Sequence, residues 1–140
     1  MADTNVRQIP AHDSELLARE AVKILIEKKG VQVCLYDVHE TSPITDYYIN
    51  VTGRSLNQVA ALADYLFDGL SERGRRAARI EGKRGDGWIL VDYHDVIVNV
   101  FDKEAREFYD LDRLFPRESL IDITDEIRAV DEKMSANKNN

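Results

Sequence analysis

The segment from Gly87 to Phe101 constrains the fold of this chain more than any other stretch. It reads Gly-Trp-Ile-Leu-Val-Asp-Tyr-His-Asp-Val-Ile-Val-Asn-Val-Phe, so two apolar and largely β-branched runs flank the polar pair His94-Asp95. Two such runs joined by two residues are typical of a β-hairpin. We therefore expect one strand at residues 88–93 and a second at residues 96–101.

The expected register places Trp88 opposite Phe101 and separates the two faces of the hairpin. One face is apolar apart from a tyrosine hydroxyl and should face the core; it carries Ile89, Val91, Tyr93, Val96, Val98 and Val100. The other face mixes large apolar groups with an acid and an amide: Trp88, Leu90, Asp92, Asn99 and Phe101. Burial would require hydrogen-bond partners for Asp92 and Asn99, whereas exposure would leave Trp88 in water. This face is therefore either a protein-binding surface anchored by Trp88 or a buried layer in which a helix covers Trp88 and pairs Asp92.

The rest of the chain shows helical and strand periodicity in alternation. The expected segments, in chain order, are a helix at 14–29, strands at 31–38 and 46–52, a helix that begins after Ser55 and ends at Gly74, a strand at 77–81 and the two hairpin strands. Asp13 or Ser14 can cap the first helix, and Gly30 is expected as its left-handed C-cap. Ser55 and Gln58 fit a capping box for the second helix. We therefore expect an α/β (α+β) fold with a five-stranded sheet and the order α-β-β-α-β-β-β.

At 140 residues the chain is long enough for one compact domain and too short for two. We expect a flexible arm at residues 1–12, a single domain at 13–116 and a charged, partly disordered tail at 117–140. After the hairpin, a short helical segment is expected to be held on the sheet by Phe108, Leu111, Leu114 and Phe115. Asp46 and Tyr47, at the start of a strand, either shape a turn or face a partner.

The formal net charge is −7, so the overall field repels nucleic acid phosphates and permits basic partners such as ribosomal proteins. One basic cluster interrupts this acidity; its members are Arg75, Arg76, Arg79, Lys83 and Arg84, next to Arg73. The cluster is either a solvated sheet edge or a contact for RNA phosphate. The chain has one cysteine and no apolar run near the about 18 residues of a membrane span, and we expect a cytoplasmic protein without disulfides.

The sequence lacks the motifs of common enzyme and metal sites. His12, His39 and His94 are scattered and Cys34 stands alone, which argues against a metal site. No phosphate-binding Gly-x-x-x-x-Gly-Lys loop and no nucleophile elbow occurs. We therefore expect no catalytic residues, no metal and no cofactor, which describes a protein that is not an enzyme.

Several separate motifs, in the same order, resemble the ribosomal silencing factor family, also called Iojap-related proteins. The matching segments are Asp37, Ser42–Gly53, Ser55 with Gln58, Glu81-Gly82, Gly87–Phe101 and Arg106–Leu114. Together they cover about residues 14–115. Three positions depart from the family pattern: His94 stands where Gly is usual, Asn99 where His is usual, and Phe115-Pro116 where a Trp often closes the domain.

The resemblance implies a mixed sheet similar to the nucleotidyltransferase fold, without its Gly-Ser…Asp-x-Asp catalytic signature. It also implies a homodimer and a translational repressor that binds the large ribosomal subunit through its fourteenth protein, and so blocks association with the small subunit. The partner-binding positions that it implies are Trp88, Leu90, Asp92, Asn99, Phe101, Asp46 and Tyr47. Two alternatives remain open: an RNA-binding large-subunit assembly factor that uses the basic cluster, and a nucleotidyltransferase remnant that binds nucleotide and metal.

Overall fold

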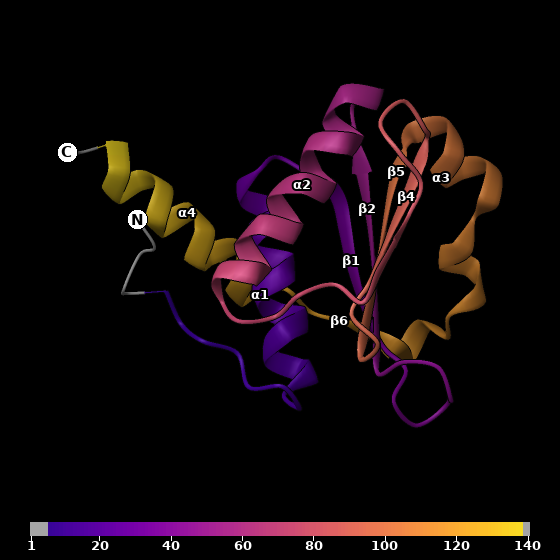
Figure 1. Cartoon of the computed structure of the whole chain (residues 1–140), viewed down its shortest axis with the longest axis horizontal. Helices are drawn as coiled ribbons and strands as arrows, with labels where there is room; N and C mark the ends of the chain where they lie inside the picture. The colour runs from indigo at the N-terminus through magenta and orange to yellow at the C-terminus, as the bar shows by residue number, and fades with distance from the viewer. Residues whose placement is uncertain (1–5, 139–140) are drawn as a thin grey trace.

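The computed structural model describes residues 6–138, which form one mixed sheet with helices on both faces (Figure 1). The helices are α1 (Ser14–Glu27), α2 (Leu56–Glu72), α3 (Lys103–Tyr109) and α4 (Thr124–Lys138), with short 3-10 turns η1 (Leu111–Leu114) and η2 (Arg117–Ser119). The strands are β1 (Val31–Asp37), β2 (Tyr47–Gly53), β3 (Arg79–Glu81), β4 (Trp88–Asp92), β5 (Val96–Asp102) and β6 (Leu120–Ile121). The predicted order α-β-β-α-β-β-β is confirmed from α1 to β5.

The sheet has six strands in the order β3-β4-β5-β2-β1-β6. Strands β2 and β5 run parallel at its centre, and every other neighbouring pair is antiparallel. The fold class is confirmed, but the expected count of five strands is wrong. The sixth strand, Leu120–Ile121, is only two residues long and adds to the edge of β1 from a segment too charged to show strand periodicity.

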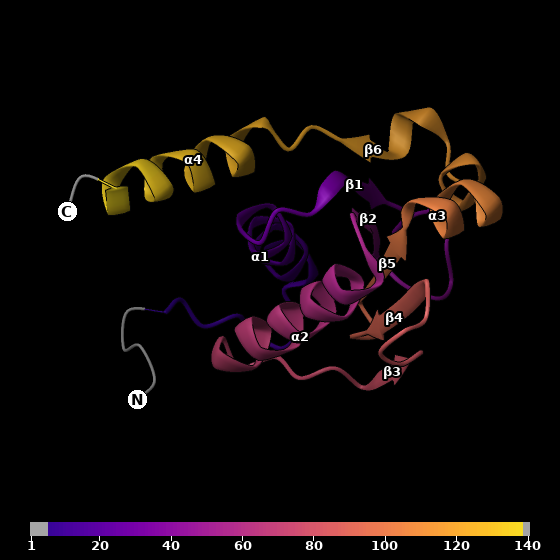
Figure 2. The same cartoon turned by 90° about the horizontal axis from the view of Figure 1, so that it is seen from above.

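The sheet separates two different layers, as the view from above shows (Figure 2). Helices α1 and α2 cover one face and bury the apolar core, which includes Leu17, Leu25, Leu66, Leu70, Ile49, Val51, Val98 and Val100. Helix α3 and the η1 turn lie on the opposite face, close to β5 and β2. The six hairpin residues expected on the core side are all buried under the helices.

The hairpin register is the predicted one, because Trp88 pairs with Phe101, Leu90 with Asn99 and Asp92 with Ile97. His94 in the connection has a φ of 73°, a left-handed conformation that explains why glycine suits this position.

Two helix ends differ in detail from the prediction. Asp13 caps α1 by accepting from the Leu16 amide at 3.0 Å, as expected. The left-handed residue after α1 is Lys29, with a φ of 71°, and not Gly30. Gly30 is needed for space, because a Cβ there would lie 2.6 Å from Val51 Cγ2. In the capping box, Ser55 accepts from the Gln58 amide, but the Gln58 side chain accepts from the Arg54 amide and not from Ser55.

The segment expected to be a tail contains β6, which pairs with the sheet, and α4, which packs on α1. Arg19 Nη1 donates to Glu126 Oε1 at 2.9 Å, Lys133 pairs with Glu27, and Val130 is buried between the two helices. Of the expected flexible arm, residues 6–12 are described; Ile9 is buried, and its amide donates to the Arg73 carbonyl at 2.9 Å. Residues 1–5 and 139–140, parts of the expected arm and tail, lie outside the described residues.

Candidate functional site

The face of the sheet opposite α1 and α2 carries five of the seven predicted partner-binding residues. Alternation along β4 and β5 places these side chains on one surface: Trp88, Leu90, Asp92, Asn99 and Phe101. Asp92, Asn99 and Phe101 are buried, whereas Trp88 and Leu90 are half-buried. The structure therefore combines features of both interpretations of this face: its interior is closed and its aromatic edge reaches the surface.

An aromatic patch forms where α3 meets this face. The Trp88 ring lies 4.7 Å from the Tyr109 ring and 5.2 Å from the Phe101 ring, and Phe108 meets Tyr109 edge-to-face at 5.1 Å. We call these four residues the aromatic patch. Phe108 is 81% exposed and Tyr109 46% exposed. Large aromatic side chains held by their neighbours, yet open to solvent, are typical of interface anchors.

Phe108 is a residue whose exposure the sequence did not reveal. The expectation that it helps to hold its segment on the sheet is wrong, as is the same expectation for Leu114, which is 61% exposed. Phe115 does hold the segment, because its ring stacks on Tyr36 at 4.6 Å and on Tyr48 at 4.9 Å. Consecutive residues of an α-helix point in directions about 100° apart, so Phe108 and Tyr109 in α3 cannot both face the sheet.

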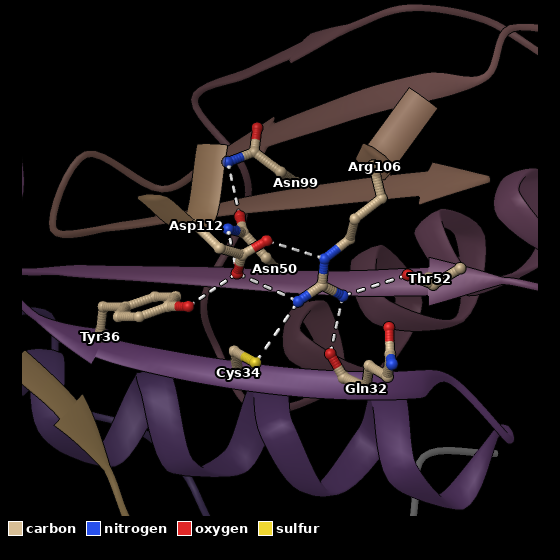
Figure 3. A network of polar contacts seen from close by, with 8 residues as sticks. All are labelled: Gln32, Cys34, Tyr36, Asn50, Thr52, Asn99, Arg106 and Asp112. Carbon is tan, nitrogen blue, oxygen red and sulfur yellow. Dashed lines mark hydrogen bonds and ion pairs between the residues drawn. The ribbon is translucent and has the colours of Figure 1, made fainter. Parts of the chain in front are cut away.

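A chain of hydrogen bonds runs from Trp88 into the sheet, and Figure 3 shows the part of it from Asn99 to Asp112. Trp88 Nε1 donates to Asn99 Oδ1 at 3.0 Å, and Asn99 Nδ2 donates to Asn50 Oδ1 at 3.1 Å. Asn50 Nδ2 then donates to Asp112 Oδ1 at 3.1 Å. Because each amide uses its oxygen and its nitrogen in one direction, the chain fixes the orientation of both asparagines and of the Trp88 ring.

Asp112 is the acceptor on which this network converges. Its carboxylate accepts from the Tyr36 hydroxyl at 2.7 Å and from Arg106 Nε and Nη2 at 3.0 and 3.1 Å. Burial by itself raises the pKa of Asp112, but hydrogen bonds from Arg106, Tyr36 and Asn50 outweigh burial and hold that pKa below its usual value. Burial and the bond to Asp112 raise the pKa of Tyr36 well above its usual value.

Arg106 joins α3 to the strands beneath it. Beyond its contacts with Asp112, its Nη1 donates to the Gln32 carbonyl at 2.7 Å and to Thr52 Oγ1 at 3.1 Å. The network therefore positions α3, and with it Phe108 and Tyr109, against the sheet. Sequence analysis missed these supporting residues; the available signal was an asparagine, Asn50, inside an otherwise apolar strand, because a buried amide requires partners.

Asp92 has a partner, but not from a covering helix. Its Oδ2 accepts from Arg79 Nη2 at 3.3 Å and its Oδ1 from the His94 amide at 2.7 Å. In the buried-layer alternative a helix would pair Asp92, whereas in the structure the edge strand β3 supplies the pairing cation.

Asp46 and Tyr47 lie apart from the other five predicted residues. Tyr47 pairs with Val96, at the opposite end of β5 from the Trp88 pair, and its side chain is buried on the helix-covered side of the sheet. Burial, followed by the nearby acid Asp37, raises the pKa of Tyr47 to about 12. The Asp46 amide donates to the Asp95 carbonyl, so this residue belongs to the turn end of the hairpin.

The basic cluster is largely paired with acids. Arg75 Nη2 lies 2.7 Å from Asp95, Arg79 pairs with Asp92 and Glu81, and Arg84 lies 3.6 Å from Asp64. The Arg76 guanidinium lies over the Phe67 ring at 5.9 Å, and Lys83 is exposed. A phosphate that approached this cluster would compete with carboxylates already in place.

Within residues 6–138, no group of three or more His, Cys, Asp or Glu side chains is placed to hold a metal ion. Across that same part of the chain, no helix has the length and apolar composition that a membrane crossing requires.

Comparisons with known proteins agree with this architecture. Residues 10–140 match the sequence profile of the family described as "Ribosomal silencing factor during starvation". The ribosomal silencing factor RsfS of Halalkalibacterium halodurans is 35% identical over 99 residues, which are 71% of this chain and 85% of that protein. The mouse protein named "Mitochondrial assembly of ribosomal large subunit protein 1" is 29% identical over 111 residues, 77% of this chain and 49% of the mouse protein. A crystal structure of a Chromobacterium violaceum protein superimposes with a TM-score of 0.70 at 31% identity, covering 72% of this chain and 84% of that one. This chain therefore belongs to the ribosomal silencing factor family.

Proposed function

We propose that this protein is a non-enzymatic translational repressor of the cytoplasm. It binds the large ribosomal subunit through that subunit's fourteenth protein, and its bulk then blocks association with the small subunit. The observation that carries the proposal is the aromatic patch, which exposes Phe108 and Tyr109 beside the half-buried Trp88, in a chain whose family is described as "Ribosomal silencing factor during starvation".

The patch has the composition of a protein-binding surface. Interface cores are enriched in Trp, Tyr and Phe, and a few such anchors supply most of the binding energy. Trp88 and Tyr109 are held by stacking and, for Trp88, by the hydrogen bond to Asn99, so that little side-chain entropy is lost on binding.

Charge favours the same partner class. The chain carries a net charge of −7, and ribosomal proteins are commonly basic. Opposite charge accelerates encounter and fixes orientation, while the patch supplies the apolar contact.

The test is sedimentation of the purified protein with separated ribosomal subunits. We expect co-migration with large subunits alone, and Trp88→Ala should weaken binding by about 2 kcal/mol or more. Phe108→Ala is the companion variant, because a side chain 81% exposed can be removed without a cost to folding. Tyr65→Ala is the matched control: Tyr65 is 49% exposed on α2, which covers the other face of the sheet. Binding that survives both patch variants, or is lost equally in Tyr65→Ala, would contradict the proposed surface.

A second candidate function is large-subunit assembly, with RNA as the binding partner. The name of the mouse relative favours the assembly role. In that case binding would fall steeply with salt and would depend on the unpaired members of the basic cluster, so Arg76→Glu and Lys83→Glu would abolish it while Trp88→Ala would not.

We also propose a homodimer of the free protein. A dimer that buried the aromatic patch would compete with the ribosomal partner, and dilution would then increase ribosome binding. Analytical ultracentrifugation of the wild type and of Phe108→Ala measures dimerisation, and the subunit sedimentation assay at several protein concentrations measures the effect of dilution on ribosome binding.

A further inference from the structure

A cavity of about 390 Å³ lies where the two parallel strands end. Strands β2 and β5 finish side by side, with Gly53 in register with Asp102. The cavity is lined by residues at or just after these ends, namely Thr52 and Gly53 at the end of β2, Arg54 after it, and Lys103, Arg106 and Glu107 in α3. In open, mostly parallel α/β sheets, ligands bind outside the carboxyl ends of the strands, and the single parallel pair β2–β5 presents the same kind of edge here.

The charge of this cavity is opposite to that of the chain. Three of its lining side chains are cationic and one, Glu107, is acidic, on a chain of net charge −7. Arg106 is neutralised by Asp112, but within residues 6–138 no carboxylate forms an ion pair with Arg54 or Lys103. In the basic cluster, by contrast, carboxylates already pair with most arginines. The positive charge of the cavity is not balanced in this way, so it should attract an anion.

The backbone around the cavity is held in an unusual shape. Gln32 has a φ of 52°, and the pairing of β1 with β2 shifts between Val31 and Cys34. This bulge turns the Gln32 carbonyl toward Arg106 Nη1, at 2.7 Å (Figure 3). Left-handed conformations at non-glycine residues cost free energy and cluster at binding sites, and β-bulges redirect side chains at such sites.

The Arg54 side chain is also held in place by a backbone carbonyl. Its Nη1 donates to the Lys29 carbonyl at 3.1 Å, which restrains the guanidinium while other N–H groups of the fork stay available. Lys103 lies at the start of α3, across the cavity, and is exposed. Val31 adds an apolar wall.

We propose that this cavity binds a phosphorylated small molecule of nucleotide size, whose phosphates contact Arg54 and Lys103. A volume near 390 Å³ lies within the range of small-ligand sites. Guanidinium and ammonium groups recognise phosphate by charge-assisted hydrogen bonds. The proposal concerns binding alone, requires no metal, and does not depend on the function proposed for the aromatic patch.

The test is isothermal titration of the full chain with ATP, GTP and inorganic pyrophosphate in the absence of divalent metal. We expect saturable binding of at least one probe, weakened about tenfold or more by Lys103→Ala and by Arg54→Ala, since each removes a charge-assisted hydrogen bond. Lys83→Ala is the matched control, because it removes the same charge from an exposed site at the far edge of the sheet.

Two results would overturn the proposal: no binding of any probe up to about 1 mM, or equal weakening by Lys83→Ala, which would indicate non-specific attraction. Amide chemical shifts give an independent readout. Binding in the cavity should move the resonances of Thr52, Gly53 and Lys103, and changes confined to the basic cluster would contradict the assigned site.

Discussion

The two faces of the sheet are stabilised in different ways. The face under α1 and α2 is apolar, with Ile49, Val51, Val98 and Val100 fully buried against helices that carry matching apolar stripes. The opposite face buries asparagine, arginine and aspartate in one hydrogen-bonded network and leaves the aromatic residues Phe108 and Tyr109 at the surface. The first face is held by burial, whose free energy is large and does not depend on direction. The second is held by hydrogen bonds, which add little net stability and fix geometry.

This difference fits the binding role that we propose for the second face. A core needs close packing, whereas a binding surface needs side chains that stay in place while they remain exposed. The chain that runs from Asp112 through Asn50 and Asn99 to Trp88 supplies that rigidity from below. Exposure of an apolar ring is then compatible with a defined position.

The largest expected effect comes from a cavity under the helices. Ile49→Ala, at a fully buried position of β2, should lower the free energy of unfolding by about 4 kcal/mol. Ile97→Ala is the matched variant on the opposite face, where Ile97 is 7% exposed, and should cost about 2 kcal/mol because the thinner cover can relax. Urea unfolding measures both. Equal costs would mean that the two faces are packed alike.

The next effect comes from removing the cation at the centre of the network. Arg106→Met leaves Asp112 without its ion pair and should cost about 3 kcal/mol of unfolding free energy. The control is Lys103→Met, an exposed position on the same helix, with an expected cost within about 0.5 kcal/mol. The double variant Arg106→Met/Asp112→Leu should recover part of the loss, because no unpaired charge remains. If Arg106→Met were as mild as the control, the network would not stabilise this face.

The two faces also differ in how far the sequence predicted them. The hairpin, its register and its core side follow from alternation over adjacent residues, so they could be predicted locally. The network could not, because Asp112 meets Tyr36 and Asn50 across 76 and 62 residues of chain, and periodicity does not report which distant segments meet. The exposure of Phe108 could not be predicted for a related reason: the side of α3 that faces the sheet is the side from which Arg106 reaches Asp112, a contact that periodicity does not report.

The smallest expected effect is the dependence of the network on acid. Hydrogen bonds hold the folded-state pKa of Asp112 below its usual value of about 3.9, so this carboxylate contributes stability above that pH and loses it as pH falls through the folded-state pKa. We expect the difference in unfolding free energy between the wild type and Asp112→Asn to be constant near neutral pH and to shrink below about pH 4. Urea titrations at a series of pH values measure this difference. Asp64→Asn, an exposed acid on α2, is the control and should show no such convergence beyond that of its weak pair with Arg84. A difference that stayed constant down to pH 3, or that grew with acid, would show that Asp112 acts on this face through its shape and not through its charge.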